Sequence, residues 1–259
     1  MASWNPKQCL QFADLRSRPC HDLANRVGIP HAGRIVDLGC GTGNSTEVLA
    51  ARWPDASITG IDSSPAMIDA ARSASPNGDW RAGNIEDWLA SPDERYDLVF
   101  SNAALQWVGN HARLFPALFA HVEPGGALAV QMPCNYHTHQ NRIPRELAAS
   151  PKWRRWFPEG RAQEWFSYEP DFYYDLLAPL ASRLDIWTSE YLQPMADAEA
   201  IVDWYKGTGL RPYLEVIGDD AERRRFLSEY LARLRPHYPA RASGGVLFAF
   251  RRVFIVAYH

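Results

Sequence analysis

The stretch "RIVDLGCGTGNSTEVLA", residues 34–50, decides the fold. An apolar, β-branched run leads into three glycines, Gly39, Gly41 and Gly43, and a helical pattern then continues to Pro54. A short buried strand, a glycine turn and a helix in this order form the first half of a β-α-β unit. Turns of this kind hold dinucleotides, phosphates or sulfonium cofactors, so the fold alone does not name the ligand.

The alternation of strand and helix patterns continues to residue 133. We expect further strands at 57–62, 79–84, 96–102 and 127–133, and helices at 44–53 and 66–74. This order predicts an α/β fold with a parallel sheet and helices on both faces. After Pro133 the sequence becomes rich in aromatic residues, proline and arginine and loses the strand alternation. We therefore predict three parts. Residues 1–133 form the N-terminal segment and the cofactor-binding core, residues 134–183 and 197–243 form a helical cap and substrate region, and residues 184–196 and 244–259 form the final antiparallel strands of the core sheet.

Composition restricts the class of partner. The chain has 259 residues, 46% of them hydrophobic, and a formal net charge of −3, so it can bury a large core but has no basic footprint for nucleic acid. Its four cysteines are scattered without metal-ligand spacing, which indicates neither a disulfide scaffold nor a metal site. No long apolar run is present, so we expect a cytoplasmic protein that does not enter membranes. We also expect a monomer or a weak homo-oligomer.

The glycine spacing argues against the phosphate ligands. A dinucleotide fingerprint needs its third glycine one residue later, where this chain has Asn44, and the Gly-Lys-Ser/Thr of a phosphate loop is absent. Asp37, before the turn, would repel a pyrophosphate and attract a cationic ligand. Asp62, at the end of the next strand, can accept hydrogen bonds from both hydroxyls of a ribose. The combination favours S-adenosylmethionine.

The segments "VDLGCGTG", "GIDSS", "GNIEDW", "YDLVFSNAALQW" and "VEPGGALAV" together resemble the class I S-adenosylmethionine-dependent methyltransferases. The resemblance implies a Rossmann-like, mostly parallel seven-stranded sheet with an added helical cap. It also implies three groups of cofactor contacts. The methionine part and the ribose would contact Asp37, Gly39, Gly41, Gly43 and Asp62. The adenine would lie beside Ser63, Met67, Asn84 and Ile85. The floor of the site would be formed by Asn102, Ala103, Gln106 and Trp107.

The acceptor of the methyl group determines which further residues are needed. Amines and phenols must lose a proton to a base, whereas a carboxylate is already ionised at neutral pH. For a carboxylate we expect cationic anchors and no catalytic base, with Trp107 and Arg211 positioning the substrate. The candidate substrate-binding residues are Arg18, Trp107, His137 and Arg211.

A closer resemblance runs from residue 4 to residue 257. The segments "AVQMP" and "GTGLRP" and the ending "LFAFRRVFIVA" are similar to the trans-aconitate 2-methyltransferase family. This implies methyl transfer to one carboxylate of a small tricarboxylate, trans-aconitate, giving a monomethyl ester and S-adenosylhomocysteine. The chain departs from the family at Cys9 and Cys134, where Tyr and Asp are usual. Two other readings stay open: a methyltransferase for another small molecule, and a protein that binds S-adenosylmethionine without catalysis.

Overall fold

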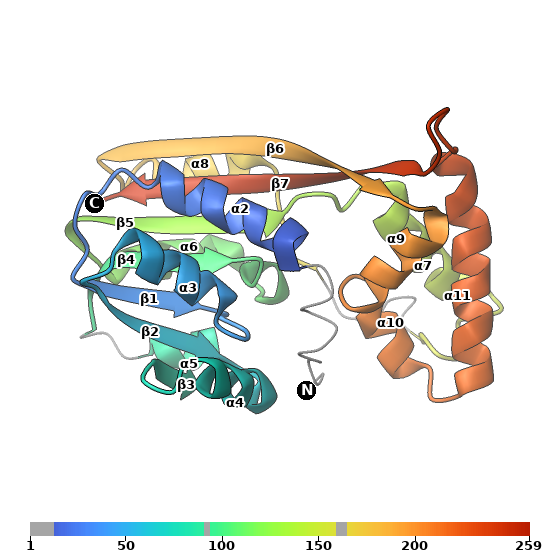
Figure 1. Ribbon diagram of the computed structural model, residues 1–259, viewed down its shortest axis with the longest axis horizontal. Helices are drawn as coiled ribbons and strands as arrows, with labels where there is room; N and C mark the ends of the chain where they lie inside the picture. The colour runs from blue at the N-terminus through green and yellow to red at the C-terminus, as the bar shows by residue number, and fades with distance from the viewer. Residues whose placement is uncertain (1–12, 91–93, 159–164) are drawn as a thin grey trace. The chain divides into compact units, whose positions relative to one another are not determined.

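The computed structural model describes residues 13–90, 94–158 and 165–259 (Figure 1). In this part of the chain seven strands form one sheet in the order β3-β2-β1-β4-β5-β7-β6. The strands are β1 (Arg34–Leu38), β2 (Ser57–Asp62), β3 (Asp79–Ala82), β4 (Tyr96–Asn102), β5 (Val122–Pro133), β6 (Arg183–Met195) and β7 (Val246–Tyr258). The pairs from β3 to β5 are parallel and β7 pairs with β5 antiparallel, which confirms the predicted fold class.

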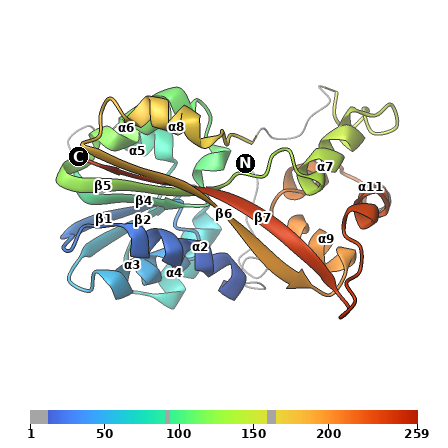
Figure 2. The same cartoon turned by 90° about the horizontal axis from the view of Figure 1, so that it is seen from above.

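Helices cover both faces of the sheet, as expected. Those of the first half are α2 (Ala13–Arg26), α3 (Asn44–Arg52), α4 (Pro65–Ala74), α5 (Ile85–Leu89), the 3-10 turn η1 (Leu105–Trp107) and α6 (His111–Ala120). The other described helices of the chain are α7 (His139–Ala149), α8 (Pro170–Leu177), α9 (Ala198–Lys206), α10 (Arg211–Val216), α11 (Asp220–Leu234) and the 3-10 turn η2 (Arg235–His237). Figures 1 and 2 show α2, α3 and α4 on one face and α5, α6 and α8 on the other.

The local sequence explains where the helices beside the sheet begin. Gly43 adopts a left-handed conformation and releases the chain into α3. Pro65 occupies the first turn of α4, where its missing N–H is not needed. The Asn84 side chain accepts a hydrogen bond from the Asp87 N–H at the start of α5. These three starts place the helices directly after the strands, so the connecting turns lie at the carboxyl ends of β1, β2 and β3.

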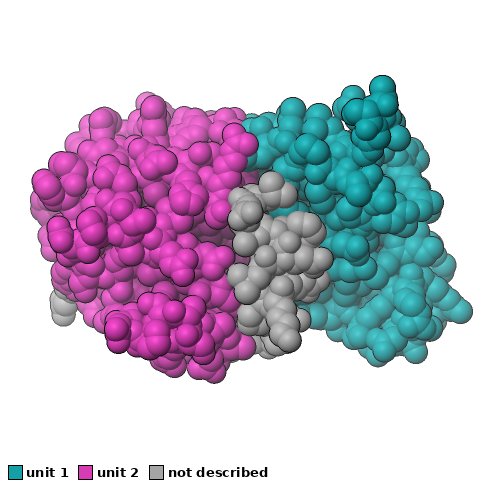
Figure 3. Space-filling view, viewed as in Figure 1, with its two compact units in different colours: residues 1–2, 135–165, 190–251 teal, residues 3–134, 166–189, 252–259 magenta. Residues whose placement is uncertain are grey.

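The chain divides into two compact units (Figure 3). The core unit contains the described residues of 3–134, 166–189 and 252–259. The helical unit contains the described residues of 135–165 and 190–251. Strands β6 and β7 each contribute residues to both units.

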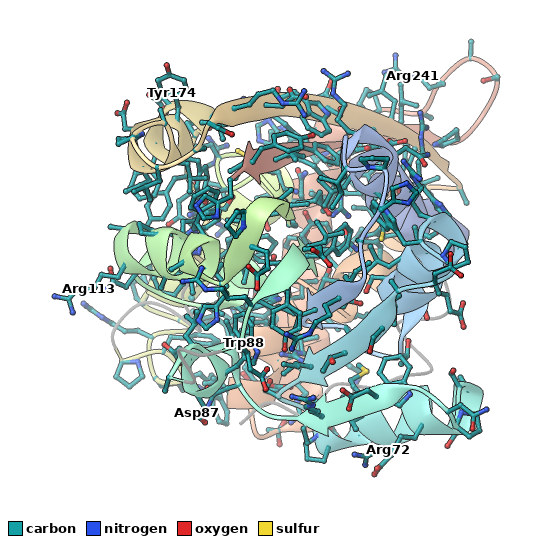
Figure 4. The ribbon with its side chains drawn as sticks, turned by 90° about the vertical axis from the view of Figure 1, so that its left-hand side faces the viewer. Arg72, Asp87, Trp88, Arg113, Tyr174 and Arg241 are labelled. Atoms are coloured by element: carbon teal, nitrogen blue, oxygen red, sulfur yellow. The ribbon has the colours of Figure 1, made fainter. Side chains whose placement is uncertain are left out.

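Residues 166–183 group with the core unit, although we assigned them to the cap from the sequence. The cause is the packing of α8 on α6: the Tyr173 ring centre lies 4.6 Å from that of Phe115, and its hydroxyl is 2.9 Å from Nδ1 of His111. The side chain of the next residue, Tyr174, points outward from α8 and is exposed (Figure 4). The functional boundaries of the cap stay a prediction.

Aromatic side chains fill the interior of the helical unit. Trp153 packs edge-on against Phe226 at 5.0 Å between ring centres, and Tyr213 stacks on Phe226 at 5.9 Å. Trp204 and Phe248 join α9 to the first part of β7. This unit therefore has its own hydrophobic core, built from residues far apart in the sequence. Among the described residues, no helix has both the length and the apolar character needed to span a bilayer.

Candidate functional site

The glycine turn after β1 has a backbone that other residues would strain. Gly39 has φ +76°, and a Cβ there would lie 2.1 Å from Cβ of Ala104. Its N–H and that of Cys40 both donate to the Ile61 carbonyl, at 2.8 and 3.1 Å, which ties the turn to β2. Gly41, with φ +58°, has no protein atom near the position of a Cβ. The turn is thus closed on the side of Ala104 and open at Gly41, where a ligand can approach the backbone.

The turn is also supported by a residue that the sequence analysis missed. The Trp80 ring, buried in β3, would lie 2.9 Å from a Cβ at Gly43 and 2.5 Å from one at Gly60. It packs with Cys40 and Ile68 in one apolar cluster. The tryptophan therefore occupies the space that two glycines leave and fixes the turn against β2 and β3.

Asp62 ends β2 with its carboxylate oriented by backbone donors. Its Oδ2 accepts from the Gly41 N–H at 3.0 Å and its Oδ1 from the Ser64 N–H at 2.9 Å. Burial raises the pKa of this carboxyl, and the two N–H groups partly oppose the shift. Each oxygen keeps a lone pair for a further donor. This arrangement suits two neighbouring hydroxyls, as the sequence predicts for a ribose.

Asp37, inside β1, is fully buried. Its Oδ2 accepts from the Ser45 and Thr46 hydroxyls, each at 2.7 Å. Its Oδ1 is buried and has no hydrogen-bond partner among the described residues. Burial raises the pKa of Asp37 to about 6, although the two hydroxyls favour the charged form. Ionisation of the Asp37 carboxyl is therefore unfavourable in the absence of a cation, and a positively charged ligand would stabilise the ionised form.

The last residue of β4 and the segment after it supply two more buried oxygens without a hydrogen-bond partner among the described residues. Ala103 has a left-handed backbone with φ 56°, and its N–H donates to the Gln131 carbonyl at 2.8 Å. Nε2 of Gln106 donates back to the Ala103 carbonyl at 2.6 Å. Oε1 of Gln106 and Oδ1 of Asn102 are buried and make no hydrogen bond to any described residue. Because β4 lies beside β1, this loop and the glycine turn share one sheet edge.

The four residues predicted to lie beside the adenine have different surroundings. Met67 and Ile85 are buried, whereas Ser63 is exposed. Asn84 uses its side chain to cap α5, with both its oxygen and its nitrogen bonded to Asp87 at 2.7 Å. The Gly83 N–H donates to the Asp62 carbonyl, which brings this loop to the end of β2. Contact of these four residues with the cofactor stays a prediction.

The predicted substrate contacts are spread over both units. Trp107 is half-buried in η1, and Arg18 is exposed on α2 with its Nε 4.0 Å from Oδ2 of Asp22. His137 is exposed, and Arg211 begins α10 with only 12% of its side chain exposed and Nε 3.6 Å from Oε1 of Glu215. The structure brings the cofactor candidates to one sheet edge, and the roles of these four residues stay predictions. Cys9 lies outside the described residues.

Comparison with known proteins identifies the family. A profile described as "Methyltransferase domain" matches residues 35–126. The trans-aconitate 2-methyltransferase of Paracidovorax citrulli is 46% identical over 99% of this chain and 98% of its own length. That of Variovorax paradoxus is 45% identical, again over 99% and 98%. The chain belongs to the trans-aconitate 2-methyltransferase family.

Solved structures support the fold of this trans-aconitate 2-methyltransferase family member. The YcgJ protein of Bacillus subtilis superposes with a TM-score of 0.61 at 13% identity, covering 93% of this chain and 98% of its own. The geranyl diphosphate C-methyltransferase of Streptomyces coelicolor, solved with S-adenosyl-L-homocysteine, gives 0.51 at 15% identity, covering 97% and 82%. At these identities the likeness shows a shared architecture alone.

A member of this family is a methyltransferase, and its cofactor is S-adenosylmethionine. The residues of the candidate site fit that molecule. The buried oxygens without a partner, on Asp37, Asn102 and Gln106, are all acceptors, and the cofactor carries an ammonium group, two ribose hydroxyls and a cationic sulfur. The phosphate groups of a nucleotide would present only further acceptors to them. The unsatisfied atoms therefore favour the cofactor that the glycine spacing predicts.

Proposed function

We propose that this chain transfers a methyl group from S-adenosylmethionine to one carboxylate of trans-aconitate, giving a monomethyl ester and S-adenosylhomocysteine. The observation that carries the proposal is full-length similarity, at 46% identity, to a protein named trans-aconitate 2-methyltransferase. The unsatisfied acceptors on Asp37, Asn102 and Gln106 support the cofactor half of the reaction. When bound, the cofactor supplies a methyl group made electrophilic by the sulfonium.

The chain's own residues then have to hold the reactants. Asp62 orients the ribose, and Asp37 with Gln106 and Asn102 binds the charged methionine part. Arg211 binds a carboxylate of the substrate, as we predict from the sequence, because a guanidinium matches a carboxylate with two parallel hydrogen bonds. Most of the catalytic benefit then comes from alignment of a nucleophile that is already ionised.

No histidine near the floor of the candidate site is free to act as a base in the described core unit. His111 follows η1, and both its ring nitrogens are engaged: Nδ1 lies 2.9 Å from the Tyr173 hydroxyl and Nε2 lies 3.0 Å from the Leu105 carbonyl. Burial lowers the pKa of His111, which disfavours a proton on its ring beyond the one it already carries. These contacts support an acceptor that needs no deprotonation.

Methyl transfer from labelled S-adenosylmethionine tests the proposal. Purified protein should convert trans-aconitate to a monomethyl ester faster than other di- and tricarboxylates. With cofactor saturating, the rate should stay within about twofold between pH 7 and 9, because the acceptor carboxylates are ionised throughout. A rate that rises through this range would indicate a phenol or amine as the natural acceptor. Tight cofactor binding without turnover of any carboxylate would contradict an enzymatic role on this substrate class.

A further inference from the structure

Two arginines one turn apart on α7 have different surroundings. Arg142 is exposed, with Nε 3.1 Å from Oε1 of Glu146 and Nη2 3.2 Å from Nδ1 of His139. Arg145 is half-buried and has no carboxylate partner among the described residues. Arg142 forms an ion pair with Glu146 on its own helix, whereas Arg145 feels the charge of Glu146 without an ion-pair contact among the described residues.

The guanidinium of Arg145 has a fixed orientation. Its Nη2 donates to the Tyr136 carbonyl at 2.9 Å, and its Cζ lies 3.4 Å from the centre of the Tyr136 ring. The His137 ring packs edge-on against Tyr136 at 5.3 Å between centres. Burial raises the pKa of the Tyr213 phenol on α10, and the positive charge of Arg145 partly opposes this rise. The two side chains are therefore near each other. The carbonyl and ring of Tyr136 therefore orient the guanidinium, and Tyr213 of α10 is near enough to interact with its charge.

One nitrogen of this oriented group has no partner. Nη1 of Arg145 is buried and makes no hydrogen bond to any described residue. Burial also lowers the pKa of the side chain, but a guanidinium stays protonated in proteins, so the donor keeps its charge. Burying a charged donor without an acceptor is unfavourable, and an anionic ligand is the acceptor that would compensate.

We propose that Arg145 binds a carboxylate of the substrate through Nη1, at a site that includes Tyr136 and Tyr213. This rests on the proposed function, since the acceptor there is a tricarboxylate. A carboxylate that accepts a charge-assisted hydrogen bond is a weaker nucleophile. Arg145 therefore binds a carboxylate that is not methylated, and it selects acids that carry at least two carboxylates over acids that carry one.

The two arginines of α7 provide a matched test. Arg145→Gln should raise the KM for trans-aconitate by about 30-fold, the scale for losing hydrogen bonds to a charged group, with the cofactor Kd and the Tm little changed. Arg142→Gln, on the same helix, should leave the KM within about twofold, because an exposed ion pair contributes little. Arg145→Lys should lie between them, since it keeps the charge but loses the planar donor geometry.

Substrate preference separates binding from a structural role. We expect the ratio of kcat/KM for trans-aconitate to that for an unsaturated monocarboxylic acid to fall at least about tenfold in Arg145→Gln and to persist in Arg142→Gln. A structural defect would lower both values of kcat/KM and leave their ratio unchanged. An unchanged KM or an unchanged ratio overturns the inference while the proposed function stands.

Calorimetry distinguishes the failure of this inference from that of the proposed function. If the wild-type protein methylates no polycarboxylate, the proposed function fails, and binding of trans-aconitate in the presence of S-adenosylhomocysteine still tests Arg145. Binding that Arg145→Gln weakens and Arg142→Gln does not would support the carboxylate site. Equal binding by both variants, or no binding by the wild type, would overturn it.

Discussion

The core unit and the helical unit differ in how their candidate functional residues are spaced along the chain. In the core unit, Asp37, the glycine turn and Asp62 lie within 26 residues of one another, the first two in and after β1 and the third at the end of the neighbouring parallel strand β2. In the helical unit, Arg145 and Arg211 come from α7 and α10, separated by a long aromatic segment. The cofactor side is thus encoded by one local β-α-β pattern, whereas the proposed acceptor side depends on tertiary packing.

Disrupting the glycine turn should have the largest effect. Gly39→Val introduces a side chain at φ +76°, where its Cβ would lie 2.1 Å from that of Ala104. Strain and overpacking together should cost at least about 3 kcal/mol of unfolding free energy and abolish measurable cofactor binding. Chemical denaturation and calorimetry measure both. Gly33→Ala, at the other end of β1, is the control, because the nearest atom to its new Cβ is 3.5 Å away.

The next effect concerns the ribose contact. Asp62→Ala removes a carboxylate held by the N–H groups of Gly41 and Ser64. We expect cofactor binding to weaken by about 1.5 to 3 kcal/mol, or about 10- to 150-fold in Kd. Asp55→Ala, in the exposed turn before β2, should change nothing. An unchanged Kd in Asp62→Ala would remove the ribose assignment.

The buried acid of β1 should make cofactor binding depend on pH. The pKa of Asp37 in the folded protein is raised to about 6, above the ordinary 3.8. Protonation of Asp37 therefore stabilises the fold without cofactor at low pH, and this stabilisation is lost as the pH rises from about 4 to about 6. A cationic ligand binds the ionised form, so the Kd should rise up to about tenfold per unit as the pH falls below 6. Titration calorimetry between pH 5 and 8 should show this in the wild type and a flat profile in Asp37→Asn.

The sequence predicted the cofactor edge more completely than the rest because its signals are local. Strand patterns, Pro65 and the three glycines each act on their immediate neighbours, so the strands and the starts of α3 and α4 followed from them. The helix α6 was not predicted, and it contains Pro116, a residue that usually marks a helix boundary. Such a signal is overridden here by burial of an apolar face.

The features that could not be predicted from the sequence depend on contacts between residues far apart in the chain. Trp80 supports the glycine turn from β3, across a parallel sheet, and nothing in its neighbours indicates that contact. Tyr173 holds α8 on the core unit through His111 and Phe115, which is why residues 166–183 group differently from their sequence texture. The partnerless atoms of Asp37 and Arg145 depend on packing in the same way.

Parallel measurement of cofactor Kd and substrate KM in Asp62→Ala and Arg211→Ala tests the division between the two units most directly. We expect each variant to change a different constant. Asp62→Ala should weaken cofactor binding with little change in the KM for trans-aconitate at saturating cofactor. Arg211→Ala should raise that KM about tenfold or more with the cofactor Kd within about twofold, because it loses a bidentate carboxylate contact. If both variants change the same constant, or if Arg211→Ala changes neither, the assignment of the acceptor to the helical unit is contradicted.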